Sequence, residues 1–557
     1  MDRRFKKSTY SMHASDVESL LKSAVSSHQA GRFDVAERGY QSVLAAAADH
    51  PHALHLYGVL QHQLRRNEEA LELIDKAIAL SPDSWEFHCN RSLVLEALDR
   101  QDEAIKSLTE LTQKTTEAGL WLELSHCLEK ANLLEDAVDV LSRLIENHPE
   151  EDRAWSRKGA ILQKLGRLED AEAACRKAAD LAPSRPEVFN NLATVQRVLG
   201  KLAEAEASVG KAIDLRADFA SGWDNLGQIR MAADDVEGMF EAFLQCAKIR
   251  HPKNGDLPPR TKPRVARLRH DREQLRFLIT EGLLDDQYES CVETLDAICQ
   301  RSNGDAEQVN PSVQISPAEQ QVLARYYDRM LVNLPIPALE GGALNPDLDL
   351  DEIQASFLDQ DAPYVVIDNF LKPEAIDQLY RYGLYSTVFY QEYDNGYLTT
   401  RMTKGFNSEL LVQMVQEIPA RLPRIFGDSK LKEAWIFKCD SRMKALDTHA
   451  DFAAVNFNIW LTPDEANVDP ESGGLTVFDK SAPADWSFES YNVRSDRIAQ
   501  YLEASGASPR HVHYRHNRAL IFRSSLFHRS EAMHFHDGYK NRRQNLTLLY
   551  GHREKNL

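Results

Sequence analysis

Residues 155–183 read WSRKGAILQKLGRLEDAEAACRKAADLAP. A large residue, Trp155, stands four positions before a small one, Gly159, and a second small residue, Ala171, follows twelve positions later. Small residues let two antiparallel helices approach closely, the indole fills the gap beside them, and Pro183 ends the second helix. The stretch therefore predicts a helical hairpin.

The same pattern recurs at a nearly constant period through the first half of the chain. The alanines equivalent to Ala171 lie 34, 33, 34 and 34 residues apart. They are Ala70, Ala104, Ala137, Ala171 and Ala205. The preceding small residues are Gly58, Ser92, Ser125, Gly159 and Ala193. With weaker copies around Ala36 and around Trp223 and Gly227, the period predicts about seven helical hairpins over residues 16–252.

Residues 16–252 resemble the tetratricopeptide repeat family on this pattern. The resemblance implies an α-helical solenoid that binds a protein or peptide partner. One position of the repeat, which in the family faces the concave groove, carries Asn90, Asn191 and Asn225, whereas intervening copies carry Glu123 and Arg157. These asparagines either grip a peptide backbone or are ordinary polar helix-surface residues, and the interrupted row slightly favours the second interpretation.

The composition restricts the class of protein. A chain of 557 residues exceeds one compact core, so two or more domains are expected. A net charge of −19 argues against nucleic acid as partner, and no apolar run reaches the roughly 20 residues of a membrane helix. The seven scattered cysteines indicate reduced thiols and a cytoplasmic location. The basic residues 1–15 are expected to be a solvated tail, because no apolar stretch of a secretory signal follows.

Residues 253–345 break the period and are predicted to be a helical linker. They contain PPRTKPRVARLRHDREQLR (residues 258–276), which carries Arg260, Lys262, Arg264, Arg267, Arg269 and Arg272. Such a run is either a basic patch for an acidic partner or a solvated helix face, and we expect the second.

From residue 346 the pattern changes to short strands separated by turns, with one or two helices. This pattern favours a β-sandwich or jelly roll over residues 346–557. Within it, THADFAAVNFNIWL (residues 448–461) places His449 and Asp451 just before a strand, and SSLFHRSEAM contains His528. Two imidazoles and one carboxylate on one face of a metal suit Fe(II) and oxygen chemistry, and a jelly roll brings distant strand ends together.

A third element is RRQNLTLLYG (residues 542–551). In a strand, Arg543, Asn545 and Thr547 share one face, and the leucines between them face the other. A guanidinium beside the metal could anchor a dicarboxylate through its planar fork. Arg542 is the competing anchor, and the alternation disfavours it.

Residues 362–551 resemble the Fe(II)- and 2-oxoglutarate-dependent dioxygenases, in particular the prolyl-hydroxylase-like group. The segments YVVIDNFLKPEAIDQL and WLTPDEANVDPESGGLTVF also carry the resemblance. It implies a double-stranded β-helix (jelly roll) with flanking helices. It further implies that the iron ligands and catalytic residues are His449, Asp451 and His528. Arg543 would hold the distal carboxylate of 2-oxoglutarate, with Asn545 where the family often has serine.

The resemblance implies a hydroxylase that consumes 2-oxoglutarate and O2 and releases succinate and CO2, with ascorbate as a further candidate cofactor. The intact Asp451 favours hydroxylation, because related halogenases carry a small residue there. We expect the repeats to recruit a protein or peptide substrate. The alternatives are a small-molecule hydroxylase whose repeats serve assembly only, and a non-catalytic scaffold with a degenerate barrel.

The remaining histidines suggest a second site only weakly. They are His511, His513, His516, His534 and His536. The H-x-H pairs could bind another metal, but with Asp537 as the only adjacent carboxylate, we expect strand-surface or loop residues. Trp460 and Phe457 are expected in the core, and Tyr491 is a candidate for the substrate mouth.

Overall fold

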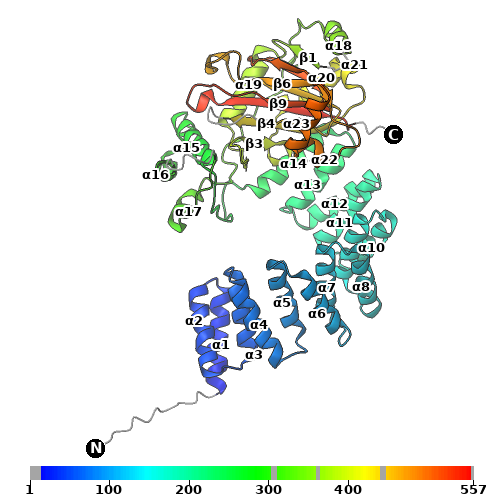
Figure 1. The fold of residues 1–557 in the computed structure, drawn as a ribbon, viewed down its shortest axis with the longest axis vertical. Helices are drawn as coiled ribbons and strands as arrows, with labels where there is room; N and C mark the ends of the chain where they lie inside the picture. Colours follow the sequence, from blue (N-terminus) through cyan, green and yellow to red (C-terminus); the bar gives the residue numbers. More distant parts are fainter. Residues whose placement is uncertain (1–13, 303–309, 359–363, 440–446, 554–557) are drawn as a thin grey trace, which may run out of the picture. The chain divides into compact units, whose positions relative to one another are not determined.

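The computed structural model describes residues 14–302, 310–358, 364–439 and 447–553 (Figure 1). The chain divides into two compact units, Met1–Leu215 and Arg216–Leu557, which are described separately. The predicted tail lies almost wholly outside the described residues.

Over its described residues, 14–215, the first unit is a row of six helical hairpins built from twelve α-helices. Their bounds are α1 Ala14–Gln29, α2 Phe33–Ala46, α3 Pro51–Gln63, α4 Asn67–Leu80, α5 Trp85–Ala97, α6 Gln101–Thr112, α7 Ala118–Lys130, α8 Leu134–Asn147, α9 Asp152–Lys164, α10 Leu168–Leu181, α11 Pro186–Val198 and α12 Leu202–Leu215. The helical prediction for this region is therefore confirmed.

Small residues set the distance between the two helices of a hairpin. A Cβ placed on Gly58 of α3 would lie 2.6 Å from Ile74 Cγ1 of α4, and one on Gly159 would collide with the Cys175 thiol of α10. Because such distances are shorter than van der Waals contact allows, the glycines are required by the close packing of the helices.

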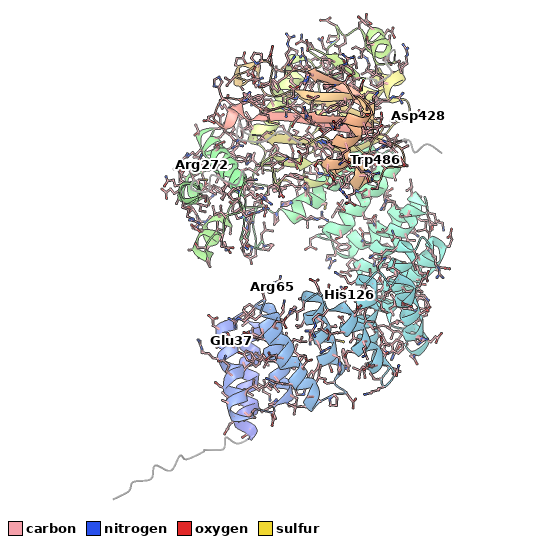
Figure 2. The ribbon with its side chains drawn as sticks, viewed as in Figure 1. Glu37, Arg65, His126, Arg272, Asp428 and Trp486 are labelled. Atoms are coloured by element: carbon pink, nitrogen blue, oxygen red, sulfur yellow. The ribbon has the colours of Figure 1, made fainter. Side chains whose placement is uncertain are left out.

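Each hairpin turns through a residue in the left-handed backbone region. This position is Gly31, Gly166 and Gly200 in three hairpins, but Arg65, Asp99 and Asn132 in the others, with φ between 57° and 76°. The following amide closes the helix end, as where Arg66 N–H donates to Gln61 O at 2.9 Å. Arg65 is labelled in Figure 2.

Large aromatic residues fasten the loops between hairpins. The indole N–H of Trp121 donates to Thr115 O at 3.1 Å, and that of Trp155 donates to Pro149 O at 2.9 Å. The aromatic position therefore holds the preceding loop by a hydrogen bond, in addition to filling space.

The second unit begins with the last helical hairpin, formed by α13 (Ala220–Ala232) and α14 (Val236–Arg250). Phe240 and Phe243 of α14 belong to the main hydrophobic core of this unit, and Asn407 Nδ2 donates to Phe240 O at 3.0 Å. The predicted domain boundary at residue 252 therefore does not separate the compact units. The repeat pattern continues to residue 252, but its last copy folds with the strands.

The segment predicted to be a helical linker is also part of the second unit. It contains α15 (Val265–Thr280), η1 (Asp286–Tyr288), α16 (Glu289–Arg301) and α17 (Pro317–Leu323). Its arginines do not form a solvated face, because Arg267 is buried, pairs with Asp271 and donates to Phe389 O at 2.7 Å. Arg260 pairs with Asp328 and Glu392. These distant partners cannot be seen in the local charge pattern.

Two antiparallel sheets form the centre of the second unit. The seven-stranded sheet has the order β1-β8-β5-β10-β4-β3-β2, and the three-stranded sheet has the order β7-β6-β9. The bounds are β1 Tyr364–Ile367, β2 Gln391–Glu392, β3 Leu398–Arg401, β4 Leu431–Cys439, β5 Val455–Trp460, β6 Leu475–Ser481, β7 Pro509–Val512, β8 Ala519–Arg523, β9 Leu526–Ser530 and β10 Arg543–Tyr550.

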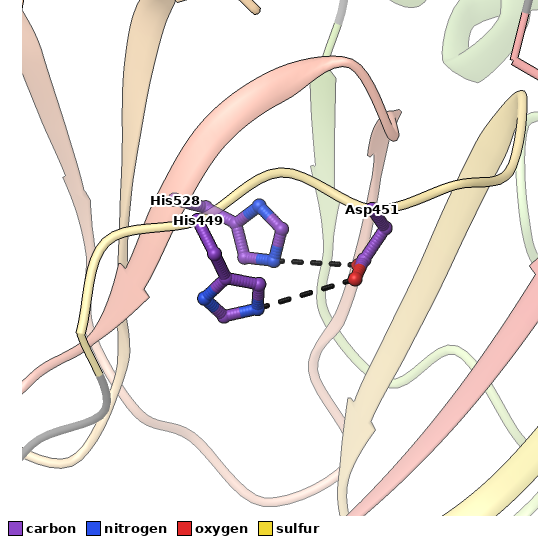
Figure 3. Close-up of side chains that lie close together, drawn as sticks. All are labelled: His449, Asp451 and His528. Carbon is purple, nitrogen blue, oxygen red and sulfur yellow. Dashed lines mark ion pairs between the residues drawn. The ribbon is translucent and has the colours of Figure 1, made fainter. Parts of the chain in front are cut away.

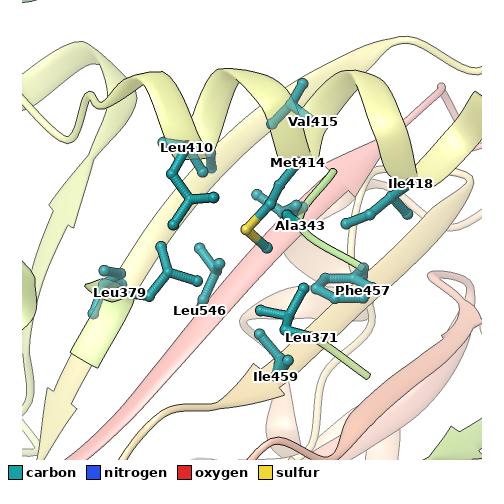
Figure 4. Packing of buried hydrophobic residues seen from close by; sticks show 14 of the residues in the cluster. Ala343, Leu371, Leu379, Leu410, Met414, Val415, Ile418, Phe457, Ile459 and Leu546 are labelled. Carbon is teal, nitrogen blue, oxygen red and sulfur yellow. The ribbon is translucent and has the colours of Figure 1, made fainter. Parts of the chain in front are cut away.

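Alternation along the central strands gives the large sheet two different faces. One face packs against helices, where Leu546 of β10 and Phe457 of β5 meet Met414 of α20 and Leu379 of α19 (Figure 4). The helices of this part are α18 Leu350–Leu358, α19 Pro373–Tyr385, η2 Met402–Lys404, α20 Glu409–Arg421, α21 Pro423–Phe426, η3 Asp464–Ala466, α22 Phe488–Asn492, α23 Ser495–Ala504 and η4 Tyr539–Asn541.

The other face of the large sheet packs against the small sheet. Trp460 and Phe522 from the large sheet share a buried cluster with Val477 of β6 and Val512 of β7. Burial on both faces explains why every residue of β10 is buried. Trp460 and Phe457 are core residues, as predicted. The candidate site residues lie between the two sheets.

Two further observations concern the whole described chain. All seven cysteines lie in described ranges and are free thiols. Among the helices that the structure describes, none combines the length and the apolar character needed to cross a bilayer.

Candidate metal centre

His449, Asp451 and His528 come together although 79 residues separate the two histidines. His449 N–H donates to His528 O at 2.9 Å, and His528 N–H donates to His449 O at 2.8 Å. Asp451 N–H donates to Ser524 O at 2.9 Å, next to the end of β8. Main-chain hydrogen bonds between two chain segments therefore position all three side chains.

The hydrogen bonds of the two imidazoles select one tautomer. His449 Nδ1 lies 2.8 Å from Asp447 O, and His528 Nδ1 lies 3.1 Å from Leu526 O. Because a carbonyl oxygen only accepts, each Nδ1 must carry the proton. The Nε2 atoms of the neutral rings are then left with lone pairs, which is how a metal-binding histidine is usually oriented.

Both Nε2 atoms point toward the Asp451 carboxylate (Figure 3). His528 Nε2 lies 3.5 Å from Oδ2, and His449 Nε2 lies 4.0 Å from Oδ1. All three ligand atoms lie within 4.8 Å of one another. Ligands bonded to one ion at about 2.1 Å are about 3 Å apart when adjacent in an octahedron, so small side-chain movements would close the set around a metal.

The electrostatics of the centre favour neutral imidazole. Burial lowers the pKa of His528 to about 4, and the neighbouring His449 lowers it further, while Asp451 opposes the shift. A histidine must be neutral to bind a metal. The environment of His528 therefore keeps its ligand form at physiological pH.

A chain of amides supports the carboxylate. Asn456 Nδ2 donates to Asp451 Oδ2, and Asn458 Nδ2 donates to Asn456 Oδ1. Asn545 Nδ2 and the Thr547 hydroxyl donate to Asn458 Oδ1 at 2.8 and 2.6 Å. This network runs across β5 and β10 and connects the candidate ligand Asp451 to the strand that carries Arg543.

Arg543 lines the same cavity as the three candidate ligands, and the cavity has a volume of ≈ 70 Å³. The guanidinium is buried, and its Nε donates to Gly473 O at 2.7 Å. No Asp or Glu in the described ranges forms an ion pair with it, and burial lowers the pKa of Arg543. A buried arginine without a carboxylate partner is unfavourable, and an anionic ligand would relieve this.

Arg542 lies on the opposite face of β10 from the cavity. Its Nε donates to Glu273 of α15 at 2.8 Å, so its charge is already paired. The alternation of the strand thus places Arg543, Asn545 and Thr547 in the cavity and Arg542 outside it.

The loop that follows β6 supports the ligand segment from behind. Ala450, which lies between the two ligands of the H-x-D pair, donates its N–H to Tyr491 O at 2.9 Å. Asn492 Nδ2 donates to Ala450 O at 2.9 Å. Trp486 of the same loop, labelled in Figure 2, packs edge-on against Phe527. Tyr491, the candidate for the substrate mouth, has a buried side chain, and its carbonyl supports the segment that carries His449 and Asp451.

The other histidines do not form a second centre. His511 pairs with Glu531 at 2.9 Å and His534 with Asp469 at 3.4 Å, whereas His513 Nδ1 contacts Glu471 O. Within the ranges that the structure describes, the only cluster of three ligand atoms close enough for a metal is that of His449, Asp451 and His528.

The three asparagines predicted for a peptide groove are divided between the units. Asn90 Nδ2 contacts His55 Nε2 at 2.8 Å, and Asn191 Nδ2 donates to Ser156 Oγ at 2.9 Å. Each contact joins a helix to the residue 35 positions earlier in the preceding repeat. Asn225 is buried in the second unit. Asn90 and Asn191 therefore link repeats, and their role toward a peptide stays a prediction.

Several polar residues of the site could not be assigned from the sequence. Asn456 and Asn458 line the cavity, as does Trp435, whose indole N–H is buried and unpartnered among the described residues. Asn545 Oδ1 is likewise buried and unpartnered. Amides at alternate positions of an otherwise apolar strand, as in AVNFNIWL, were the available signal.

Comparison with known proteins identifies the repeats of the first unit. Residues 28–84, 63–118 and 122–186 match the model of the tetratricopeptide repeat family. The first unit thus contains tetratricopeptide repeats. No curated protein matches the chain.

Several solved structures are similar to less than half of this chain. A tetratricopeptide repeat protein from Parabacteroides merdae is 16% identical, with 43% of this chain and 95% of that chain covered and a TM-score of 0.36. MamA from Desulfovibrio magneticus is 20% identical, with 30% and 94% covered and a TM-score of 0.27. YrrB, described as having an unusual peptide-binding site, is 19% identical, with 33% and 95% covered and a TM-score of 0.27.

Proposed function

We propose that this protein is an Fe(II)- and 2-oxoglutarate-dependent hydroxylase whose second unit is a jelly roll. Two facing antiparallel sheets with the candidate ligands between them support the fold assignment. The observation that carries the activity is the combination of two features in one cavity. These are the cluster of His449, Asp451 and His528, and the buried Arg543, which forms no ion pair with a described carboxylate.

The residues fit the proposed metal and co-substrate. Two imidazoles and one carboxylate on one side of an ion leave its other positions open, which is the ligand set of non-haem Fe(II) oxygenases. The fixed tautomers present both Nε2 lone pairs to the ion. Arg543 would pair with one carboxylate of 2-oxoglutarate, and the unpartnered indole N–H of Trp435 offers a further donor.

Different residues would bind the metal, orient the co-substrate and exclude water. His449, Asp451 and His528 hold the ion, and Asn456 fixes the Asp451 carboxylate through Oδ2. Arg543 orients the co-substrate from within the barrel, and the apolar cluster between the sheets keeps bulk water away from the reacting atoms. Bound Fe(II) would supply the oxygen activation that couples decarboxylation of 2-oxoglutarate to hydroxylation.

A polypeptide is the proposed substrate, because tetratricopeptide repeats generally bind proteins or peptides. The cavity around the metal ligands holds only a small molecule, so the substrate needs a separate surface. A groove of ≈ 570 Å³ adjoins the cavity, shares Ser530 with it and is lined by Asp447 and Thr448, directly before His449. We expect the residue to be hydroxylated to approach through this groove.

Two other functions remain as alternatives. A small-molecule hydroxylase would use the same cavity, with the repeats for assembly only. A non-catalytic scaffold would need no set of ligands with fixed tautomers and no supporting amide network, and these features favour an enzyme.

The decisive experiment measures metal and co-substrate binding in sequence. The metal-free full chain is titrated with Mn(II), an inert substitute for Fe(II), and then with 2-oxoglutarate under anaerobic conditions, by calorimetry. We expect one metal per chain and 2-oxoglutarate binding that depends on it. With Fe(II) and O2, succinate should form. Stoichiometric 2-oxoglutarate binding without metal, or no metal binding at all, would contradict the proposal.

A further inference from the structure

A second cavity in the same unit contains three arginines and no acidic residue among those described. It has a volume of ≈ 490 Å³, and its charged lining residues are Arg424, Arg523 and Arg553. One wall is the segment Ala453–Val455, which begins two residues after the candidate ligand Asp451. Three positive charges in one concave site produce a strong local positive potential, which attracts anions.

Arg553 is held in a fixed position. Its Nη2 donates to Pro483 O at 2.7 Å, and its guanidinium carbon lies 4.3 Å from the centre of the Tyr491 ring. Its Nη1 is buried and has no hydrogen-bond partner among the described residues. An unsatisfied buried donor is unfavourable, because it has lost its hydrogen bonds to water. A rigid guanidinium with one donor left over is therefore prepared to bind an acceptor in the cavity.

Arg424 and Arg523 add two further positive charges to the lining of the cavity. Arg424 lies in α21 and Arg523 ends β8, and both side chains are exposed. Neither forms an ion pair with an Asp or Glu in the described part of the chain. Ser429, Ser481 and Ser525 add hydroxyl groups to the lining. Guanidinium and hydroxyl groups donate hydrogen bonds, and the oxygens of phosphoryl and carboxyl groups accept them, so the lining suits a ligand that bears such a group.

The size of the cavity indicates more than a bare ion. Sites for small organic ligands have volumes of roughly 300–1,000 Å³, and this cavity falls within that range. Phe357, Leu358 and Ile425 form an apolar part of its lining. We propose that the cavity binds a small organic molecule bearing a phosphoryl or carboxyl group, with Arg553 as its fixed anchor.

The proposed site is adjacent to the candidate metal ligands in the hydrogen-bond network. Tyr491 stacks under Arg553, and its carbonyl accepts from Ala450 N–H at 2.9 Å, between His449 and Asp451. The anion site itself does not depend on the hydroxylase proposal, because its donors are separate from the metal ligands.

The test compares four probes on the full-length protein by calorimetry at constant ionic strength. They are glucose 6-phosphate, gluconate, inorganic phosphate and glucose. We expect saturable binding of one or both organic anions at one site, weaker binding of inorganic phosphate, and none of glucose. The first two probes distinguish a phosphoryl from a carboxyl ligand. Binding of neither organic anion, or equal binding of glucose or of inorganic phosphate, would overturn the proposal.

Variants locate the site. Arg553→Gln should weaken binding about 10-fold or more, since a charge-assisted hydrogen bond contributes about 1.5–3 kcal/mol. Arg424→Gln and Arg523→Gln remove exposed side chains, so they keep the test decisive if Arg553→Gln does not fold. The matched control is Arg510→Gln, an exposed arginine of β7 outside the cavity lining. Equal loss in the control, or no loss in any of the three variants, would reject the site.

Discussion

His449 and His528 are joined by a reciprocal pair of main-chain hydrogen bonds, and their ring centres lie 4.4 Å apart. The two imidazoles are therefore placed by the backbone of two chain segments. Neither ring is needed to form the bridge that holds the other. Substituting one ligand should change the chemistry of the centre while leaving the strands in place.

Loss of the candidate carboxylate ligand should weaken metal binding strongly without unfolding the protein. Asp451→Ala removes one of three ligands, so we expect Mn(II) affinity to fall by at least about 100-fold, more than a support residue would cause. Asp447→Ala is the matched control, because its exposed side chain lies four residues away while its carbonyl still orients His449. Equal Mn(II) affinity in the two variants, measured by calorimetry, would show that Asp451 is not a ligand.

The two neighbouring arginines of β10 should behave differently. Arg543→Ala should weaken 2-oxoglutarate binding to the Mn(II)-loaded protein by about 2–5 kcal/mol, the usual effect of losing a buried charge pair. Arg542→Ala should leave 2-oxoglutarate affinity near that of the unmodified protein but lower the melting temperature, because it removes the ion pair at 2.8 Å with Glu273 and leaves that carboxylate only the longer pair with Arg272. A larger binding defect at Arg542 would contradict the assignment of Arg543.

Alanine substitutions at two helical glycines of the first unit should change the free energy of unfolding in opposite directions. A Cβ at Gly159 collides with Cys175, so Gly159→Ala should lower the free energy of unfolding by about 1–3 kcal/mol. Apart from its chain neighbours and the backbone of α12 itself, Gly210 has no described atom within 4 Å of the position that a Cβ would occupy. Gly210→Ala should therefore raise the free energy of unfolding by about 0.5–1 kcal/mol. Urea denaturation measures both. Two changes of the same sign would mean that close helix packing does not decide the effect.

The stability of the first unit should decrease in mild acid because of His55. Burial lowers its pKa to about 4, with a smaller contribution from His52, and its Nε2 contacts the Asn90 amide. In the unfolded chain the pKa is about 6.5. Between about pH 6.5 and pH 4 the unfolded state therefore binds a proton at His55 that the folded state does not bind. The free energy of unfolding keeps the whole contribution of neutral His55 above about pH 6.5, and it falls by up to about 3 kcal/mol as the pH drops toward 4.

Urea denaturation at pH 7 and pH 4.5 checks this dependence, with His55→Gln as the comparison. The variant keeps a polar side chain but has no titrating group, so it should lose less stability between the two pH values. An identical loss in both proteins would assign the acid sensitivity to other groups.

Truncation at two positions should separate the compact units. A chain starting at Arg216 retains α14 and should unfold cooperatively. A chain starting at Lys253 loses Phe240 and Phe243 from the core, each worth about 3–5 kcal/mol, which rivals the whole stability of a domain. Thermal denaturation followed by near-ultraviolet circular dichroism distinguishes the two. Equal cooperativity in both chains would contradict the packing of the last hairpin into this core.

The repeats could be predicted because each hairpin contacts mainly its neighbours, so the local pattern contains nearly all the information. The packing of the last hairpin into the second unit could not be predicted in this way, because α14 buries Phe240 and Phe243 against residues more than 100 positions away. The prediction of a solvated face for the arginine-rich segment was wrong at Arg267 for the same reason. Arg267 is buried, pairs with Asp271 and donates to Phe389 O, and the sequence pattern does not reveal the distant partner Phe389.

For the candidate site, the alternation of β10 was sufficient to place Arg543 inside and Arg542 outside. The spacing of His449 and Asp451 predicted a ligand pair, but no pattern near His528 shows that its backbone pairs with His449. The jelly roll and the iron and 2-oxoglutarate roles stay predictions. Asn456 and Asn458 were missed because a strand core tolerates an occasional amide, and only the network reveals their purpose.

The burial of α14 in the core of the second unit has a consequence for how such a protein can change in length. Within the described part of the first unit, each hairpin packs against the next one along the chain, so duplication or loss of one hairpin leaves the core of the second unit intact. The hairpin formed by α13 and α14 cannot be exchanged in this way, because its Phe240 carbonyl and aromatic rings are bound to the second unit. Descendants of this chain are therefore free to gain or lose repeats only before Arg216.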